Sequence, residues 1–323
     1  MAVGHIDIAY NTLGRATDPP VLLISGLGAQ LIAWDDAFCQ ELVDRGLFVI
    51  RFDNRDVGLS SHLAGGSLPD PSATTADAAQ AAPYTLAEMA ADAAGVIDNL
   101  GLDSAHVVGI SLGGMIAQIL AIERPERVRS LTSIMSTTGN DRVGQPTEAA
   151  RALLLSPPVS TRMAAMDRAV LFNRAVGSPA YRIDETELRD RAAQAFDRAF
   201  DPQGVVRQLA AAMTTPDRTE DLHRLDLPTL VIHGAEDQLI AVSGGMATAE
   251  AIPGAELLVI DGMGHDLPRP LWPTLAERIA ELVNRAEQQW TRSSSASVSD
   301  TWRPSKWTPT SGSSPHGDSQ SKS

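Results

Sequence analysis

Residues 109–113 read Gly-Ile-Ser-Leu-Gly and connect an apolar run, 106–110, to a helix-like run, 115–120. This is the pattern of a nucleophile elbow, a sharp strand-to-helix turn that holds its central serine in a strained backbone conformation. The crowding in such a turn is tolerable only if the residues two before and two after the serine are very small. Gly109 and Gly113 meet that requirement. We therefore interpret Ser111 as a catalytic nucleophile.

A serine hydroxyl is a poor nucleophile until a neighbouring base takes its proton, and the base needs an acid to hold it. In an architecture with this elbow, the acid and then the base follow the serine along the chain, each after a strand. His265 lies in the glycine-rich stretch 262–268, directly after the apolar run 257–260. The other histidines open or end strands, as His233 does, or lie in polar segments. The sequence therefore predicts His265 as the base.

Two adjacent carboxylates, Glu236 and Asp237, follow the apolar run 229–233. Only one of them can face the histidine. Asp237 precedes His265 by 28 residues, enough for one crossover helix and one strand, so each would end a neighbouring strand. We predict that Asp237 is the acid and keep Glu236 as the alternative. Asp266, beside the base, is interpreted as a loop charge.

Acyl transfer also needs backbone N–H groups that hold the developing oxyanion. Leu112, directly after the nucleophile, supplies the first. Residues 25–28 read Ser-Gly-Leu-Gly after the apolar run 21–24, and their glycines let the backbone approach a substrate closely. We predict the Leu27 N–H as the second donor, each donor stabilising the transition state by roughly 3 kcal/mol.

Short β-rich runs alternate with helical patterns along the chain, which is typical of a parallel sheet wrapped by helices. The predicted strands cover 5–11, 21–25, 47–52, 106–110, 129–135, 229–233 and 256–260. Thr85 and Glu88 form a capping box that opens a helix ending near Gly101. Further helices are predicted over 112–123 and about 273–288. We assign 1–136 and 204–290 to this α/β core.

Two segments depart from the alternation. Residues 137–203 are almost wholly helical in pattern and interrupted by prolines, so we predict an inserted helical lid in which Asp184 caps a helix. Its apolar residues either form a substrate-binding wall or simply pack; the candidates are Met163, Met166, Leu171 and Phe172. The segment 291–323 holds twelve serines and no apolar periodicity, so we predict a disordered tail whose role stays open.

The amino-acid composition argues against several classes of binding partner. A formal net charge of −14 argues against nucleic acid and anionic membranes, which require a basic face. One cysteine, Cys39, excludes intramolecular disulfides and cysteine zinc clusters. Residues 1–8 lack the features of a signal peptide, and no apolar run approaches the ~18 residues of a membrane span, so we expect a cytoplasmic protein. The sequence leaves the oligomeric state open.

These motifs together resemble the α/β-hydrolase superfamily over residues 5–289. Residues 51–61 look like the loop after the family's fourth strand, and with residues 26–28 and 262–265 they are most similar to the aclacinomycin methylesterase-like branch, close to bacterial carboxylesterases and lipases. The resemblance implies an α/β-hydrolase fold, with a mostly parallel central sheet flanked by helices and an inserted helical lid. This chain departs from the family at Ser25, where many members carry histidine, and in showing one strand before residue 21 where two are usual.

The resemblance also implies roles for individual residues. The triad positions are matched by Ser111, Asp237 and His265, and the oxyanion positions by Leu27 and Leu112. Asp53 and Arg55 match loop positions whose role is structural pairing.

We therefore expect a serine hydrolase that cleaves a small to medium, fairly hydrophobic carboxylic ester through an acyl-enzyme on Ser111, with no cofactor and no metal. Thioester, lactone or carbon–carbon hydrolysis and perhydrolysis on the same triad are alternatives, because fold alone does not define the bond that is attacked. A non-catalytic protein that binds a small ligand on this scaffold is a further one. A serine nucleophile argues against haloalkane dehalogenase and epoxide hydrolase chemistry, where the resembling families carry aspartate.

Overall fold

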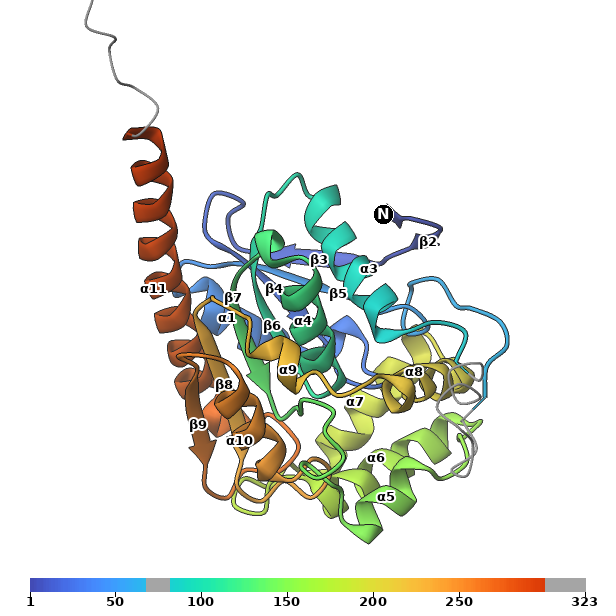
Figure 1. The fold of residues 1–323 in the computed structure, drawn as a ribbon. Coiled ribbons are helices and arrows are strands. Elements are labelled where there is room, and N and C mark those ends of the chain that lie inside the picture. Colours follow the sequence, from blue (N-terminus) through green and yellow to red (C-terminus); the bar gives the residue numbers. More distant parts are fainter. Residues whose placement is uncertain (68–81, 300–323) are drawn as a thin grey trace, which may run out of the picture. The chain divides into compact units, whose positions relative to one another are not determined.

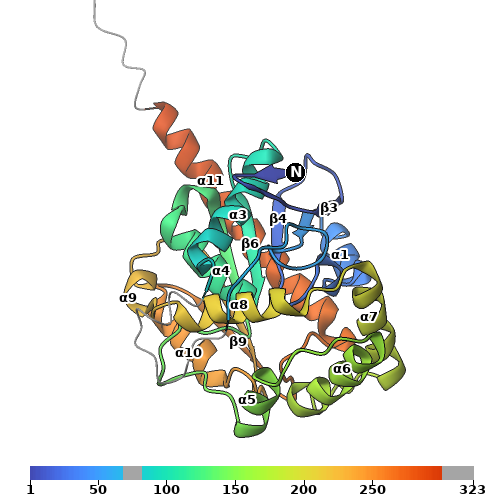
Figure 2. The ribbon, with the colours of Figure 1, turned by 90° about the vertical axis from the view of Figure 1, so that its right-hand side faces the viewer.

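The computed structural model describes residues 1–67 and 82–299. The described chain contains a seven-stranded sheet in the order β3-β5-β4-β6-β7-β8-β9 (Figures 1 and 2). The strands are β3 (Tyr10–Leu13), β4 (Pro20–Ile24), β5 (Phe48–Phe52), β6 (Ala105–Ile110), β7 (Val128–Ile134), β8 (Thr229–Gly234) and β9 (Glu256–Ile260). Only the β3–β5 pair is antiparallel. The predicted mostly parallel sheet is confirmed.

The N-terminal strand predicted over 5–11 is wrong in its extent. Gly4, with φ +57°, turns the chain between β1 (Ala2–Val3) and β2 (Ile6–Asp7), which form a separate antiparallel pair. Ile8 then enters the core, and its N–H donates to the Met1 carbonyl. The main sheet therefore receives only β3 ahead of β4, in agreement with the single strand visible in the sequence.

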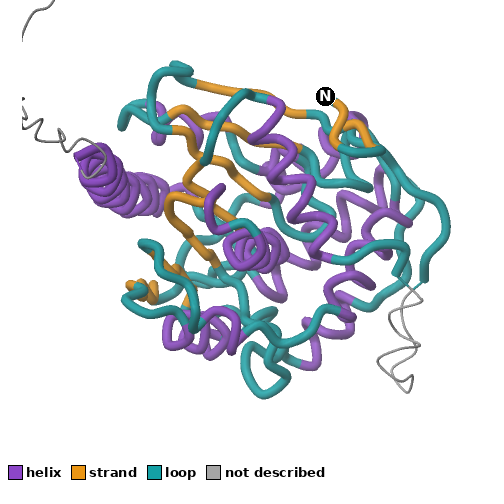
Figure 3. The backbone as a smooth tube through the Cα atoms, turned by 45° about the horizontal axis from the view of Figure 1, so that its top comes forward, coloured by secondary structure: helices purple, strands orange, loops and turns teal. Residues whose placement is uncertain are grey.

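Helices cover both faces of the sheet (Figure 3). One face packs against α3 (Leu86–Asn99) and α4 (Leu112–Glu123), the other against α1 (Asp36–Val43) and the first turns of α11 (Trp272–Ser299). The predicted capping box is present in α3, where Thr85 and Glu88 each accept the other's backbone N–H. Every residue of β4 and β5 is buried, because helices cover both faces of these strands, and all of them except Arg51 are apolar. Shorter elements are η1 (Leu31–Ala33), η2 (Pro125–Arg127), η3 (Arg269–Leu271), α9 (Thr219–Leu222) and α10 (Val242–Ala251).

A helical insertion lies between β7 and β8, where the sequence predicted one (Figure 1). It consists of α5 (Glu148–Leu154), α6 (Arg162–Val176), α7 (Glu185–Arg198) and α8 (Pro202–Thr214). Asp184 caps α7 by accepting the Thr186 N–H, as predicted. The helical segment ends at Thr214 rather than near Gln203, because α8 buries one face that includes Leu209 and Ala210.

Helix α11 also differs from its prediction. It runs to Ser299, so the disorder that we predicted from residue 291 is wrong for 291–299, and residues 300–323 lie outside the described chain. Serine does not end a helix as proline does, and the first proline after α11 is Pro304. Residues 1–287 form one compact unit, and Gln288 begins a second. None of the described helices is both long and apolar enough to cross a membrane.

The loop after β5 is held by buried ion pairs. Arg55 donates to both carboxylate oxygens of Asp92 in α3, at 2.6 and 2.9 Å. Asp53 pairs with Arg198 of α7 at 2.8 Å, which leaves both loop residues paired as the resemblance implied. The loop therefore joins the core sheet to α3 and to the helical insertion.

The Arg55–Asp92 pair gives a test of the fold. The Asp92→Ala variant should lower the free energy of unfolding by about 3 kcal/mol, because it leaves a buried guanidinium without its carboxylate. Urea denaturation measures this change. The control is Glu88→Gln, whose side chain is 54 % exposed and 3.7 Å from Arg55, and which keeps the capping box. It should cost less than about 0.5 kcal/mol. A loss below about 1 kcal/mol for Asp92→Ala would contradict the assignment.

Candidate active site

Ser111 occupies a strained turn between β6 and α4. Its φ is +56°, a region that residues with a side chain rarely adopt. A Cβ atom on Gly109 would lie 2.1 Å from the Gly113 carbonyl oxygen, and one on Gly113 would lie 2.2 Å from the Ile24 carbonyl oxygen. The two glycines are therefore required by close backbone approach, as the sequence predicted.

Three side chains predicted from separate parts of the sequence form one hydrogen-bonded chain. Ser111 Oγ lies 3.0 Å from His265 Nε2, and His265 Nδ1 lies 2.7 Å from Asp237 Oδ2. Ser111 follows β6, Asp237 follows β8 and His265 follows β9, so all three lie at the carboxyl edge of the sheet. This is the geometry of a nucleophile, a base and an orienting acid.

Asp237 is fully buried and ionised. Its Oδ1 accepts the N–H groups of Leu239 and Ile240 at 2.8 and 2.9 Å. Burial opposes the charge, but the imidazoles of His265 and His233 and the Ile240 N–H outweigh it and hold the pKa of Asp237 well below its usual range. An ionised Asp237 can only accept, so Nδ1 of His265 carries the proton and its Nε2 lone pair faces Ser111.

The alternative acid does not join this chain. Glu236 is exposed, and among the described residues its carboxylate makes no hydrogen bond to His265. His233, which lies in β8, is completely buried close to the acid. Its Nε2 donates to the Ile240 carbonyl at 2.8 Å and lies 3.5 Å from Asp237 Oδ2.

The two predicted oxyanion donors flank the nucleophile. Leu112 is the first residue of α4, and a Cβ on Gly26, next to Leu27, would lie 3.4 Å from Ser111 Cβ. Within the described chain, neither the Leu27 nor the Leu112 amide N–H has a hydrogen-bond acceptor. The N–H of Gly28 donates to Gln208 Oε1 at 2.9 Å, which ties this loop to α8.

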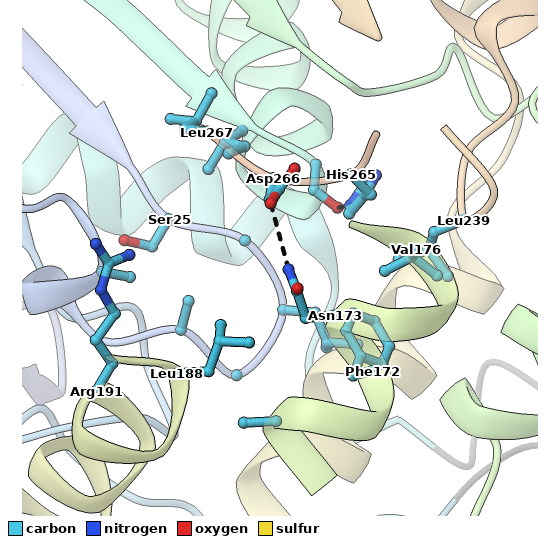
Figure 4. Close-up of a pocket in the computed structure, with 18 of the residues that line it drawn as sticks. Ser25, Phe172, Asn173, Val176, Leu188, Arg191, Leu239, His265, Asp266 and Leu267 are labelled. Carbon is cyan, nitrogen blue, oxygen red and sulfur yellow. Dashed lines mark hydrogen bonds between the residues drawn. The ribbon is translucent and has the colours of Figure 1, made fainter. Parts of the chain in front are cut away.

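A cavity of about 600 Å³ opens onto Ser111 and His265. Most of its lining is apolar, with walls from the core (Leu27, Trp34, Phe38, Trp272) and from the insertion (Phe172, Val176, Leu188). Figure 4 shows Phe172, Val176 and Leu188 around it. The sequence offered four residues for a substrate-binding wall, and of these only Phe172 lines the cavity. Met163 and Leu171 are more than half exposed, and Met166 does not reach the cavity.

One site residue was misread from the sequence. Asp266 is half-buried, lines the cavity and accepts hydrogen bonds from Ser178 and from Asn173 of α6 (Figure 4). Burial raises the pKa of Asp266 although these hydrogen bonds oppose the shift. In the sequence, the only signal that Asp266 belongs to the site was its position directly after His265.

The described residues contain one group with metal-ligand spacing. Donor atoms of Asp56, His62 and Asp201 all lie within 4.8 Å of one another. Arg207 already pairs with Asp56 at 2.9 Å and with Asp201 at 2.5 Å, so a guanidinium fills the place of a cation. The group acts as an ion-pair network between α8 and the loop after β5.

This fold and site define the class of the protein. The chain belongs to the alpha/beta hydrolase fold family, whose model matches residues 19–268.

The chain is similar to several proteins of known name and to solved structures. Rhodomycin D methylesterase DnrP of Streptomyces peucetius is 33 % identical over 288 residues, which cover 83 % of this chain and 91 % of that protein. The 2-hydroxymuconate semialdehyde hydrolase of Pseudomonas putida is 33 % identical over 207 residues, 62 % of this chain and 68 % of that protein. The crystal structure of the enol-lactonase from Burkholderia xenovorans LB400 matches with a TM-score of 0.69 at 21 % identity, covering 88 % of this chain and 99 % of that one; it shows the fold alone.

The elbow gives a second test. In Gly113→Ala, the new methyl group would meet backbone atoms that cannot move independently, so we expect a loss of about 3 kcal/mol in unfolding free energy. Thermal unfolding measures it. The control is Gly254→Ala, where no atom lies within 4 Å of the new methyl group and only the positive φ of +72° opposes alanine. That conformation costs a residue with a side chain about 1–2 kcal/mol, so this variant should lose less stability than Gly113→Ala. Equal stability of the two variants would argue against the elbow constraint.

Proposed function

We propose that the protein hydrolyses a carboxylic ester through an acyl-enzyme on Ser111. The observation that carries this proposal is the hydrogen-bonded chain from Ser111 through His265 to the buried Asp237, at the wall of an apolar cavity. No cofactor is needed for this chemistry.

The reaction proceeds in two halves. Ser111 Oγ attacks the ester carbonyl while His265 Nε2 takes its proton, and the ionised Asp237 stabilises the imidazolium that forms. The amides of Leu27 and Leu112 hold the oxyanion, and His265 then gives the proton to the departing alcohol. Water, deprotonated by His265, attacks the acyl-enzyme and releases the acid and the free serine.

The cavity and the relatives together favour a substrate with a bulky apolar acid part. Four aromatic rings line about 600 Å³ of space: Trp34, Phe38, Phe172 and Trp272. The 33 % identical relative is named a methylesterase, so we propose a methyl or other small alkyl ester of a hydrophobic acid. We further propose that α5–α8 act as a lid, because α6 and α7 supply one wall of this cavity.

Ser111→Ala tests the mechanism directly. Hydrolysis of short p-nitrophenyl esters and of hydrophobic methyl esters should fall on the order of 10⁴-fold or more, with unchanged folding, because the acyl acceptor is gone. A parallel panel of thioesters and lactones of matched acyl length identifies the bond. A fluorophosphonate probe should label wild type at Ser111. A wild type that is neither labelled nor active on esters would favour a binding protein, and equal ester hydrolysis by the variant would show that Ser111 is not the nucleophile.

The choice between the two acids has its own test. Asp237→Asn should lower kcat about 10³–10⁴-fold, because an amide at this position favours the wrong tautomer of His265. Glu236→Gln, at the adjacent exposed position, should leave kcat within about threefold, as surface substitutions away from special features do little. Steady-state kinetics on one ester decides, and a larger loss in Glu236→Gln would reverse the assignment.

A further inference from the structure

The loop that carries His265 is hydrogen-bonded to the end of α6 and the turn that follows it. The bonds run from His265 N to Val176 O (2.6 Å), Gly264 N to Ser178 Oγ (2.9 Å), Ser178 N to Asp266 Oδ1 (3.0 Å), Asn173 Nδ2 to Asp266 Oδ2 (3.3 Å) and Ala180 N to Gly262 O (3.2 Å). Ser178 Oγ also donates to Asp266 Oδ1.

Within the described chain, the core makes no such hydrogen bond to the backbone of His265, although Asp237 and Ser111 hold its side chain. Backbone bonds from the core sheet region reach the loop only as far as Met263, whose carbonyl accepts the Glu236 N–H at 2.9 Å. For residues 264–266, the hydrogen bonds of the backbone and of the Asp266 side chain within the described chain all go to the helical insertion. The main-chain position of His265 therefore depends on α6.

The two segments are also in close steric contact. A Cβ on Gly264 would lie 2.5 Å from the Val176 carbonyl oxygen, and one on Gly262 would lie 2.4 Å from Ala180 Cβ. Ser178 and Val176 are buried at 4 % and 1 % exposure. The glycines before His265 thus accommodate the helical insertion, whereas the sequence showed only that this stretch is rich in glycine.

Asp266 is the centre of this junction. It accepts only from the neutral donors of Ser178 and Asn173, and among the described residues it forms no ion pair with lysine or arginine. Figure 4 shows its carboxylate facing the Asn173 amide, with a dashed line for their hydrogen bond. A carboxylate placed in this way serves to hold two segments together.

We propose that Asn173, Ser178 and Asp266 are positioning residues that fix the backbone of His265 against the helical insertion. This inference rests on the proposed function, because it assigns a role to His265 as the base.

Ser178→Ala is the first test. Loss of the bridging hydroxyl should lower kcat about tenfold and leave KM within about twofold, since misplacement of a catalytic group by 1 Å is sufficient to cost up to 10²-fold in rate. Labelling of Ser111 by a small fluorophosphonate should slow by the same factor. Ser178→Thr, which keeps the hydroxyl, should recover most of both. The control is Arg174→Gln, which breaks only an exposed pair with Glu185 and should change neither.

An exchange of two side chains is the second test. Asn173→Asp places two carboxylates together and should lose about tenfold in kcat, whereas Asp266→Asn alone should lose less, because the Asn173 amide can flip and accept from the new amide. The double variant Asn173→Asp/Asp266→Asn reverses the donor and the acceptor and leaves Ser178 its acceptor oxygen. It should recover kcat to within about threefold of wild type.

The outcomes separate the two proposals. If wild type is labelled at Ser111 but Ser178→Ala and Asn173→Asp keep full kcat, the positioning role is overturned and the proposed function stands. If wild type is neither labelled nor active on esters, the proposed function fails first. Should Ser178→Ala fail to fold, the exchange decides: recovery in the double variant supports the junction, and additive losses overturn it.

Discussion

The backbone conformation of Ser111 is the constraint on which the rest of the structure depends. A non-glycine residue at positive φ costs of order 1–3 kcal/mol and persists only where its surroundings over-determine it. Here the Ser111 N–H donates to the Ile134 carbonyl of β7 at 2.9 Å, and the Ser111 carbonyl accepts the Ser136 hydroxyl at 2.8 Å. Both backbone groups of the serine are thus anchored in the neighbouring strand and its loop, so the sheet order β4-β6-β7 is part of the site.

The helical insertion also holds loops that form the site. Through Gln208 it contacts the oxyanion loop at Gly28 and the Arg55 carbonyl, and through Ser178 it contacts the histidine loop. These contacts come from two parts of the insertion, α8 and the turn that follows α6. A segment that the chain adds between β7 and β8 therefore supports both the electrostatic and the proton-transfer parts of the site.

The elbow, the triad residues and most strands could be predicted from the sequence, because each has a local signature such as flanking glycines or an apolar run ending in a polar turn. Ser178, Asn173 and Gln208 have none, since their partners lie between 86 and 180 residues away. Phe172 could not be distinguished from its neighbour Leu171, because tertiary packing decides which helix face meets the cavity. The predictions for the N-terminal strand and for the end of α11 were wrong for a similar reason. Local sequence pattern does not define where strand pairing or a helix stops.

The relatives of this chain include proteins named as a methylesterase, an enol-lactonase and a semialdehyde hydrolase, so the shared fold does not by itself select the bond that is cleaved. The choice of substrate then depends on the residues that shape the cavity, and in this chain many of them belong to α6 and α7. The same α6 also fastens the loop of His265. A substitution on this helix that reshapes the substrate wall therefore acts on the base as well, and specificity and rate are physically coupled through one element.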